Sequence, residues 1–196
     1  MSRPQVFKQP HATVLSQLML CVLAAFLLGC DDARLTQSRE IAAEFQQELS
    51  GRLMAALGSG GPVEAISVCK IAAPEISADL SDKAGARVAR TALKVRNTDN
   101  RPDVAARAVL EEFAADIEAG TEEPPEQFER RPDGSARYMK AIITQPMCLA
   151  CHGKELAPAV RSAIAELYPQ DEATGFATGD LRGAFIVEWP SGEATR

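Results

Sequence analysis

The stretch RGAFIVEW, Arg182 to Trp189, decides the fold class of this chain of 196 residues. It is a short run rich in aromatic and β-branched residues, which is typical of a strand. Gly175, Gly179 and Gly183 lie before it or at its start, and glycine permits the tight backbone turns needed there. A strand so late in the chain argues against an all-helical bundle and favours a fold that contains a sheet.

Two segments further upstream are also predicted to be strands. The segment ARVARTALKVRN, residues 86–97, alternates between two faces, with Val88 and Arg90 on one of them. The segment ARYMKAIITQ, residues 136–145, is the second. Residues 121–135 are acidic, rich in proline and turn-forming, which predicts an exposed loop.

The remaining periodic segments are predicted to be helical. Residues 35–57 repeat an apolar side chain every four positions, which indicates a long amphipathic N-terminal helix that ends at GSGGP. Pro74 is expected to end the next helix and to begin a further short helical piece. The other helices are predicted over residues 63–73, 101–120 and 157–169. Helices interspersed with strands indicate an α+β fold with an antiparallel sheet.

The N-terminal segment has the pattern of an export signal. Residues 1–29 carry two basic residues and then an apolar run too short to span a bilayer. The run ends in LLGC, which resembles the lipobox of bacterial lipoproteins and predicts lipidation of Cys30 after cleavage; the alternative is an ordinary signal peptide. Residues 30–196 are then one domain, lipid-anchored on the periplasmic side of a membrane. The acidic pair Asp31 and Asp32 favours the inner membrane.

The charge of the chain limits its partners. The formal net charge is −6, and removal of two bases with residues 1–29 makes it −8. No basic run remains that could bind nucleic acid, and membrane association is expected to come from the lipid.

The stretch PMCLACHGK, residues 146–154, contains the sequence C-x-x-C-H. This is the attachment motif of a c-type haem, in which Cys148 and Cys151 bond the macrocycle and His152 becomes an axial ligand of the iron. A zinc site is the alternative, but no second Cys or His pair with suitable spacing accompanies the motif. One covalently bound haem c is therefore predicted.

The ligand on the other side of the iron can be narrowed by elimination. The second histidine, His11, belongs to the segment expected to be removed, and no Met, His or Cys follows His152. The candidates are therefore a lysine, an empty position or one of four sulfur-containing residues: Cys69, Met54, Met139 and Met147. Met54 is expected to be a core residue of the first helix.

Cys69 has surroundings that suit a flat macrocycle. On a helix it shares a face with small residues such as Ala65, Ala72 and Ala73. A buried, inert cysteine fits the same pattern. The residues alone therefore leave ligation and simple burial equally open.

Four blocks of sequence resemble a known family: RTALKVRNTDNRPD, RYMKAI, CLACHG and YPQDEATGFATGDLRGAFIV. The family, found in bacteria and cyanobacteria, was first catalogued as a domain of unknown function and comprises c-type haem proteins with a PAS-like fold. The resemblance covers about residues 41–187 and implies that Cys69 ligates the iron opposite His152. The chain departs from the family pattern at Thr98, and at Val104 and Ala105, where a tryptophan is expected.

These features predict a haem sensor that responds to redox state or to a small gas and acts through a separate signalling or redox partner. The alternative is a low-potential periplasmic electron-transfer cytochrome c. Arg90 and Arg96 could bind the haem propionates. No acid–base pair accompanies the haem motif, so an enzyme is not expected.

Overall fold

The computed structural model of the chain describes residues 33–191. The predicted signal segment 1–29 and the predicted lipidation site Cys30 lie outside this range. The chain divides into two units, Met1–Ala33 and Arg34–Arg196, and the fold described below is that of the second unit.

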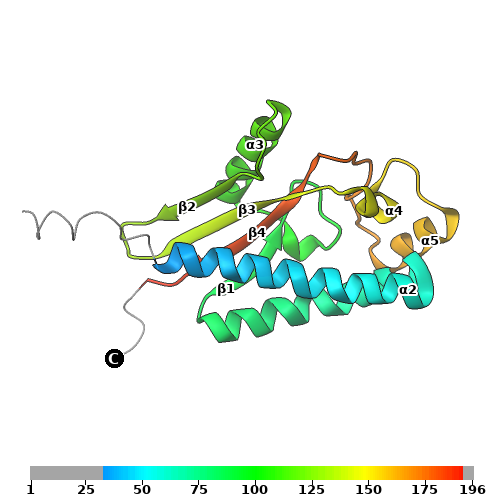
Figure 1. Cartoon of the computed structure of the whole chain (residues 1–196), viewed down its shortest axis with the longest axis horizontal. Helices are drawn as coiled ribbons and strands as arrows, with labels where there is room; N and C mark the ends of the chain where they lie inside the picture. Colours follow the sequence, from blue (N-terminus) through cyan, green and yellow to red (C-terminus); the bar gives the residue numbers. More distant parts are fainter. Residues whose placement is uncertain (1–32, 192–196) are drawn as a thin grey trace, which may run out of the picture. The chain divides into compact units, whose positions relative to one another are not determined.

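The centre of the fold is an antiparallel sheet of four strands in the order β1-β4-β3-β2 (Figure 1). The strands are β1 (Arg87–Thr91), β2 (Glu126–Arg130), β3 (Ala136–Ile143) and β4 (Leu181–Trp189). The stretch that predicted a terminal strand is thus β4, and it lies in the middle of the sheet. The predicted α+β class, with a PAS-like antiparallel sheet flanked by helices, is confirmed.

The long N-terminal helix α2 (Ala33–Ala84) consists of two arms. Gly61 separates them with φ 73° and ψ −168°, a conformation that favours glycine. The arms lie side by side (Figure 1), and the salt bridges Arg52–Glu75 at 2.8 Å and Lys83–Glu44 at 3.4 Å join them. The predicted break at GSGGP is therefore the point where the chain reverses.

The predicted helix boundary at Pro74 is wrong, because α2 continues through this residue to Ala84. Proline removes one backbone hydrogen bond from a helix interior. The turns around it are nevertheless buried on one side, at Ala72, Ala73 and Ile76. Burial of this apolar face offsets the lost hydrogen bond.

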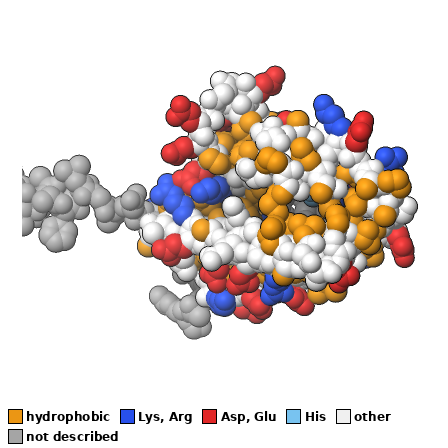
Figure 2. Space-filling model, turned by 45° about the vertical axis from the view of Figure 1, so that its right-hand side comes forward, with side chains coloured by type: hydrophobic (Ala, Val, Ile, Leu, Met, Phe, Trp, Pro, Cys, Tyr) orange, Lys and Arg blue, Asp and Glu red, His pale blue; other side chains and the backbone are white. Residues whose placement is uncertain are grey.

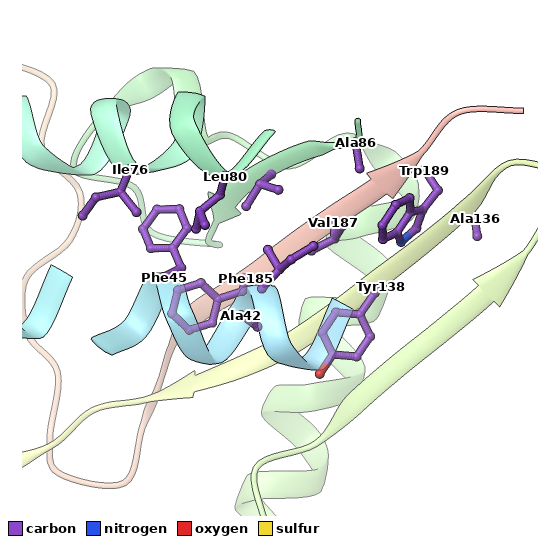
Figure 3. Packing of buried hydrophobic residues seen from close by; sticks show 12 residues of the cluster. Ala42, Phe45, Ile76, Leu80, Ala86, Ala136, Tyr138, Phe185, Val187 and Trp189 are labelled. Carbon is purple, nitrogen blue, oxygen red and sulfur yellow. The ribbon is translucent and has the colours of Figure 1, made fainter. Parts of the chain in front are cut away.

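The two faces of the sheet carry separate cores. Side chains of β4 alternate, so that Phe185 and Val187 face α2 while Ala184 and Ile186 face the helix α3 (Val104–Glu118). Figure 3 shows the first core, in which Phe45 of α2 packs on Phe185 with ring centroids 5.3 Å apart. The sheet is therefore a middle layer between α2 and α3.

The prediction of an exposed loop over residues 121–135 is wrong in part, because β2 forms within it. Phe128 pairs with Tyr138 across the β2–β3 ladder. Glu126 accepts a hydrogen bond from the Tyr138 hydroxyl at 2.7 Å and forms a salt bridge with Arg39 of α2. These contacts come from distant segments, which explains why the polar local sequence did not indicate a strand.

The predicted strand over residues 86–97 is shorter in the structure. Only residues 87–91 pair with β4, and the chain then leaves the sheet toward the short helix η1 (Thr98–Asn100). The other elements are η2 (Pro146–Cys148), α4 (Leu149–His152) and α5 (Pro158–Leu167). Within residues 33–191, no helix has the length and apolarity that a membrane span requires.

Candidate functional site

The C-x-x-C-H motif follows β3 and forms two short helical turns, η2 and α4. The amide of Cys148 donates to the carbonyl of Gln145 at 2.9 Å, and the amide of Gly153 donates to the carbonyl of Leu149 at 2.9 Å. A Cβ at position 153 would lie 2.6 Å from the Leu149 oxygen, so the close packing of this turn requires glycine. Local backbone bonding thus fixes the two thiols and His152 on one short segment.

The His152 ring is oriented by a hydrogen bond to the backbone. Its Nδ1 donates to the carbonyl oxygen of Ala173 at 2.7 Å, because a carbonyl can only accept. The Nε2 lone pair is then available to a metal, which is the usual arrangement of a ligating histidine. Burial, followed by the positive charges of Arg182 and Arg96, lowers the pKa of His152 to about 2. The ring is therefore neutral, as ligation requires.

Arg96 holds the motif against the segment that precedes β4. Its Nε donates to the Asp171 carboxylate at 3.0 Å, and both side chains are largely buried. Its Nη2 donates to the carbonyl of Cys151 at 2.6 Å and to that of Ala173 at 3.2 Å. The same guanidinium thus joins the cysteine before His152 to the residue that orients the His152 ring.

A cavity of about 260 Å³ lies beside the motif. Figure 2 shows that hydrophobic side chains surround a hollow on the face drawn there. Most of the cavity surface is apolar. It brings together all the site residues predicted from the sequence that the structure describes: Cys69, Arg90, Arg96, Cys148, Cys151 and His152.

Cys69 reaches this cavity from the second arm of α2. The neighbours predicted to share its helix face, Ala65, Ala72 and Ala73, are buried. Burial raises the pKa of the Cys69 thiol, while the Arg90 guanidinium, the next largest influence, lowers it. The charge of Arg90 therefore favours the thiolate form, which is the form that binds metals.

The other candidate ligands can be compared by their positions. Met54 is 56% exposed, so its prediction as a core residue is wrong. Met139 is buried on the α3 side of the sheet and does not line the cavity. Lys70 and Lys94 donate to the carbonyls of Leu167 at 3.1 Å and of Thr174 at 2.6 Å.

Cys69 and Met147 are thus the sulfur-containing candidates that line the cavity in the described part of the chain. Met147 adjoins Cys148 and lies on the same segment as the motif. Cys69 comes from a different element, α2, and can approach from another side.

Sequence reasoning missed one charged residue of the cavity, Arg182. Its guanidinium carbon lies 5.3 Å from the centroid of the Phe176 ring, and that ring meets the edge of His152 at 6.3 Å. Arg182 begins the stretch that predicted β4. Strict alternation along that strand would place Arg182 on the side of Ala184, opposite Phe185. The pairing of β4 with β3 changes register at this point, between Ile142 and Ile143, and no local sequence signal indicated this.

The donor set fits a c-type haem. Two thiols, an oriented neutral imidazole and a further cysteine line one largely apolar cavity, and the described cysteines form no disulfide. Among residues 33–191, no cluster of three or more His, Cys, Asp or Glu side chains could hold a metal ion such as zinc. The residues that could hold the haem are Cys148 and Cys151 for attachment, with His152 and Cys69 for the iron.

Fold and site together define an α+β domain with a C-x-x-C-H motif at the wall of a cavity. The chain belongs to the Tll0287-like family, whose model (Tll0287) matches residues 27–190. The crystal structure of the cyanobacterial heme-protein Tll0287 is similar, with 25% sequence identity and a TM-score of 0.67 over 85% of this chain and 100% of that one. No curated protein matches the chain.

Proposed function

We propose that the chain binds one haem c, attached through Cys148 and Cys151, with His152 and Cys69 as the axial ligands of the iron. The observation that supports this most strongly is the cavity that the motif and Cys69 share, although Cys69 and Cys148 are 79 positions apart in the sequence. The similarity to a solved haem protein agrees with it.

We further propose that the protein is a sensor of redox state or of a small gas. A thiolate ligand favours ferric over ferrous iron and so gives the haem a low reduction potential. Burial disfavours a free thiolate at Cys69 by raising its pKa, and the charges of Arg90 and Arg96 offset this only in part. Reduction of the iron would therefore weaken its bond to the Cys69 sulfur. Departure of Cys69 would then open a coordination position for a gas.

The second candidate function is that of a low-potential electron carrier. The second arm of α2 is tied to the C-terminal end of α5, because Lys70 donates to the Leu167 carbonyl and lies 5.6 Å from the Tyr168 ring centroid. These contacts favour a Cys69 side chain that keeps its position when the iron is reduced. A carrier would keep both ligands in both oxidation states.

The cellular setting belongs to the same proposal. A signal segment over residues 1–29 and a lipid on Cys30 would anchor the domain on the periplasmic side of a bacterial membrane, and the inner membrane is favoured by Asp31 and Asp32. A separate signalling or redox protein would receive the output.

The sensor and carrier proposals are separated by spectra of the reduced protein. The full chain is produced with the c-type haem maturation machinery, alongside Cys69→Ala and the control Met147→Leu. For a sensor, the ferric spectra of the parent and of Cys69→Ala differ, but their reduced spectra and carbon monoxide binding rates agree.

For a carrier, the reduced parent keeps its thiolate, so its spectrum differs from that of reduced Cys69→Ala and it binds carbon monoxide more slowly. The control Met147→Leu is expected to follow the parent in both states. Purified parent protein without covalent haem would contradict the proposed function as a whole.

A further inference from the structure

Two arginines of the cavity have no carboxylate partner in the described part of the chain. Arg90 of β1 has its guanidinium carbon 5.6 Å from the centroid of the Phe45 ring. Arg182 of β4 lies over the Phe176 ring and donates from Nη1 to the Lys94 carbonyl at 3.3 Å. The salt bridges found among residues 33–191 involve neither of them.

These two positive charges are partly buried and both line the cavity. Burial lowers the pKa of Arg182 to about 10, and the charge of Arg90 is the next largest cause. Asp171 acts in the opposite direction, but its carboxylate is hydrogen-bonded to Arg96. Neighbouring like charges that are partly withdrawn from water are costly unless an anion compensates them. The cavity therefore has the electrostatics of a binding site for a negatively charged group.

A polar group in a mostly apolar cavity also fixes the orientation of a bound ligand. The apolar walls suit the body of a macrocycle, while the guanidinium groups suit its charged substituents. Arginine binds carboxylates through two parallel hydrogen bonds, which adds geometric specificity.

We propose that Arg90 and Arg182 bind the two propionate carboxylates of the haem, a role that rests on the haem-binding function proposed above. This pair differs from the pair predicted from the sequence, Arg90 with Arg96. Arg96 already donates to Asp171 and to the carbonyls of Cys151 and Ala173. Its role is to position the motif, and Arg182 takes its place at the carboxylates.

The test uses the holoprotein, because haem attached through Cys148 and Cys151 stays in place when a propionate contact is lost. The variants are Arg90→Gln and Arg182→Gln, with Arg161→Gln as the matched control. Arg161 lies near the motif on α5 but does not line the cavity. The readouts are the propionate bending bands in the resonance Raman spectrum and the midpoint reduction potential.

Both cavity variants are expected to shift a propionate band and to lower the midpoint potential, because an uncompensated carboxylate near the iron stabilises the ferric state. Arg161→Gln should match the parent. If a Gln variant does not accumulate, Arg90→Lys and Arg182→Lys replace it. Lysine keeps the positive charge but loses the two parallel hydrogen bonds of arginine. The propionate band is then expected to shift, while the midpoint potential changes less than in the Gln variants.

Unchanged propionate bands in the variants of both arginines would overturn the proposal. A fall in potential without a band shift would also overturn it, because Arg90 would then act on the Cys69 thiolate instead of on a carboxylate. A parent protein that lacks covalent haem would contradict the proposed function itself. This outcome is detected before any variant is measured.

Discussion

At the scale of single residues, the site depends on a glycine position where a Cβ atom would clash with its neighbours. Gly183 is such a position, because it lines the cavity where β4 passes close to β1. A Cβ there would lie 2.5 Å from the Thr91 carbonyl oxygen and 3.0 Å from the Ala92 Cβ. The glycine thus allows the two strands to approach closely beside the cavity.

We expect Gly183→Ala to lower the free energy of unfolding by about 1–3 kcal/mol, the usual cost of overpacking. Gly51→Ala is the matched control: a Cβ at this exposed helical position meets nothing within 4 Å. It should leave stability unchanged or raise it by up to about 1 kcal/mol. Urea unfolding of both variants is the measurement. A Gly183→Ala variant as stable as the parent would show that the strands separate easily.

At the scale of elements, the helix α3 is fixed to the sheet through its N-cap residue, Asp103. The Asp103 side chain accepts from the Ala106 amide at 2.7 Å and so caps α3. It also forms an ion pair with Arg137 of β3, whose side chain is 8% exposed and also pairs with Glu188 of β4. The Asp103 carboxylate therefore joins the helix terminus to β3, and Arg137 extends the connection to β4.

This arrangement predicts an acid-dependent loss of stability. The hydrogen bond from Arg137, followed by that from Ala106, lowers the pKa of Asp103 to about 2 in the folded protein. The unfolded value is about 3.9. Because the folded pKa is the lower one, the contribution is fully present above about pH 4 and is lost as the pH falls toward about 2.

Asp103→Asn should therefore flatten the decline of stability over this pH window, whereas Asp79→Asn, at an exposed position on α2, should follow the parent. Thermal unfolding between about pH 5 and about pH 2, the window set by these pKa values, measures the effect. Parallel curves for Asp103→Asn and the parent would contradict the assigned role of the cap.

Elements with a strong local pattern could be predicted from the sequence, and elements made by distant contacts could not. The apolar strand β4 and the amphipathic first arm of α2 carry their own periodicity. The edge strand β2, EQFER, is polar, and its order depends on pairing with β3 and on Arg39. The continuation of α2 past Pro74 depends on burial against the rest of the fold, which local rules do not include.

At the scale of the whole molecule, the site exists because α2 reverses at Gly61 and returns Cys69 to the cavity that the motif lines. The motif itself could be predicted from spacing alone. The placement of Cys69 required the family resemblance, since a buried cysteine on a helix is also explained by packing. Arg182 could not be predicted, because its role follows from the lack of a salt-bridge partner for it among the described residues.

The central claim is that Cys69 is the ligand opposite His152. The most direct test is the electron paramagnetic resonance spectrum of the ferric holoprotein, recorded for the parent, Cys69→Ala and the control Met147→Leu. We predict a low-spin signal of the thiolate type in the parent and in Met147→Leu, and its loss in Cys69→Ala. A high-spin signal in the parent, or a low-spin signal that survives in Cys69→Ala, would contradict the account.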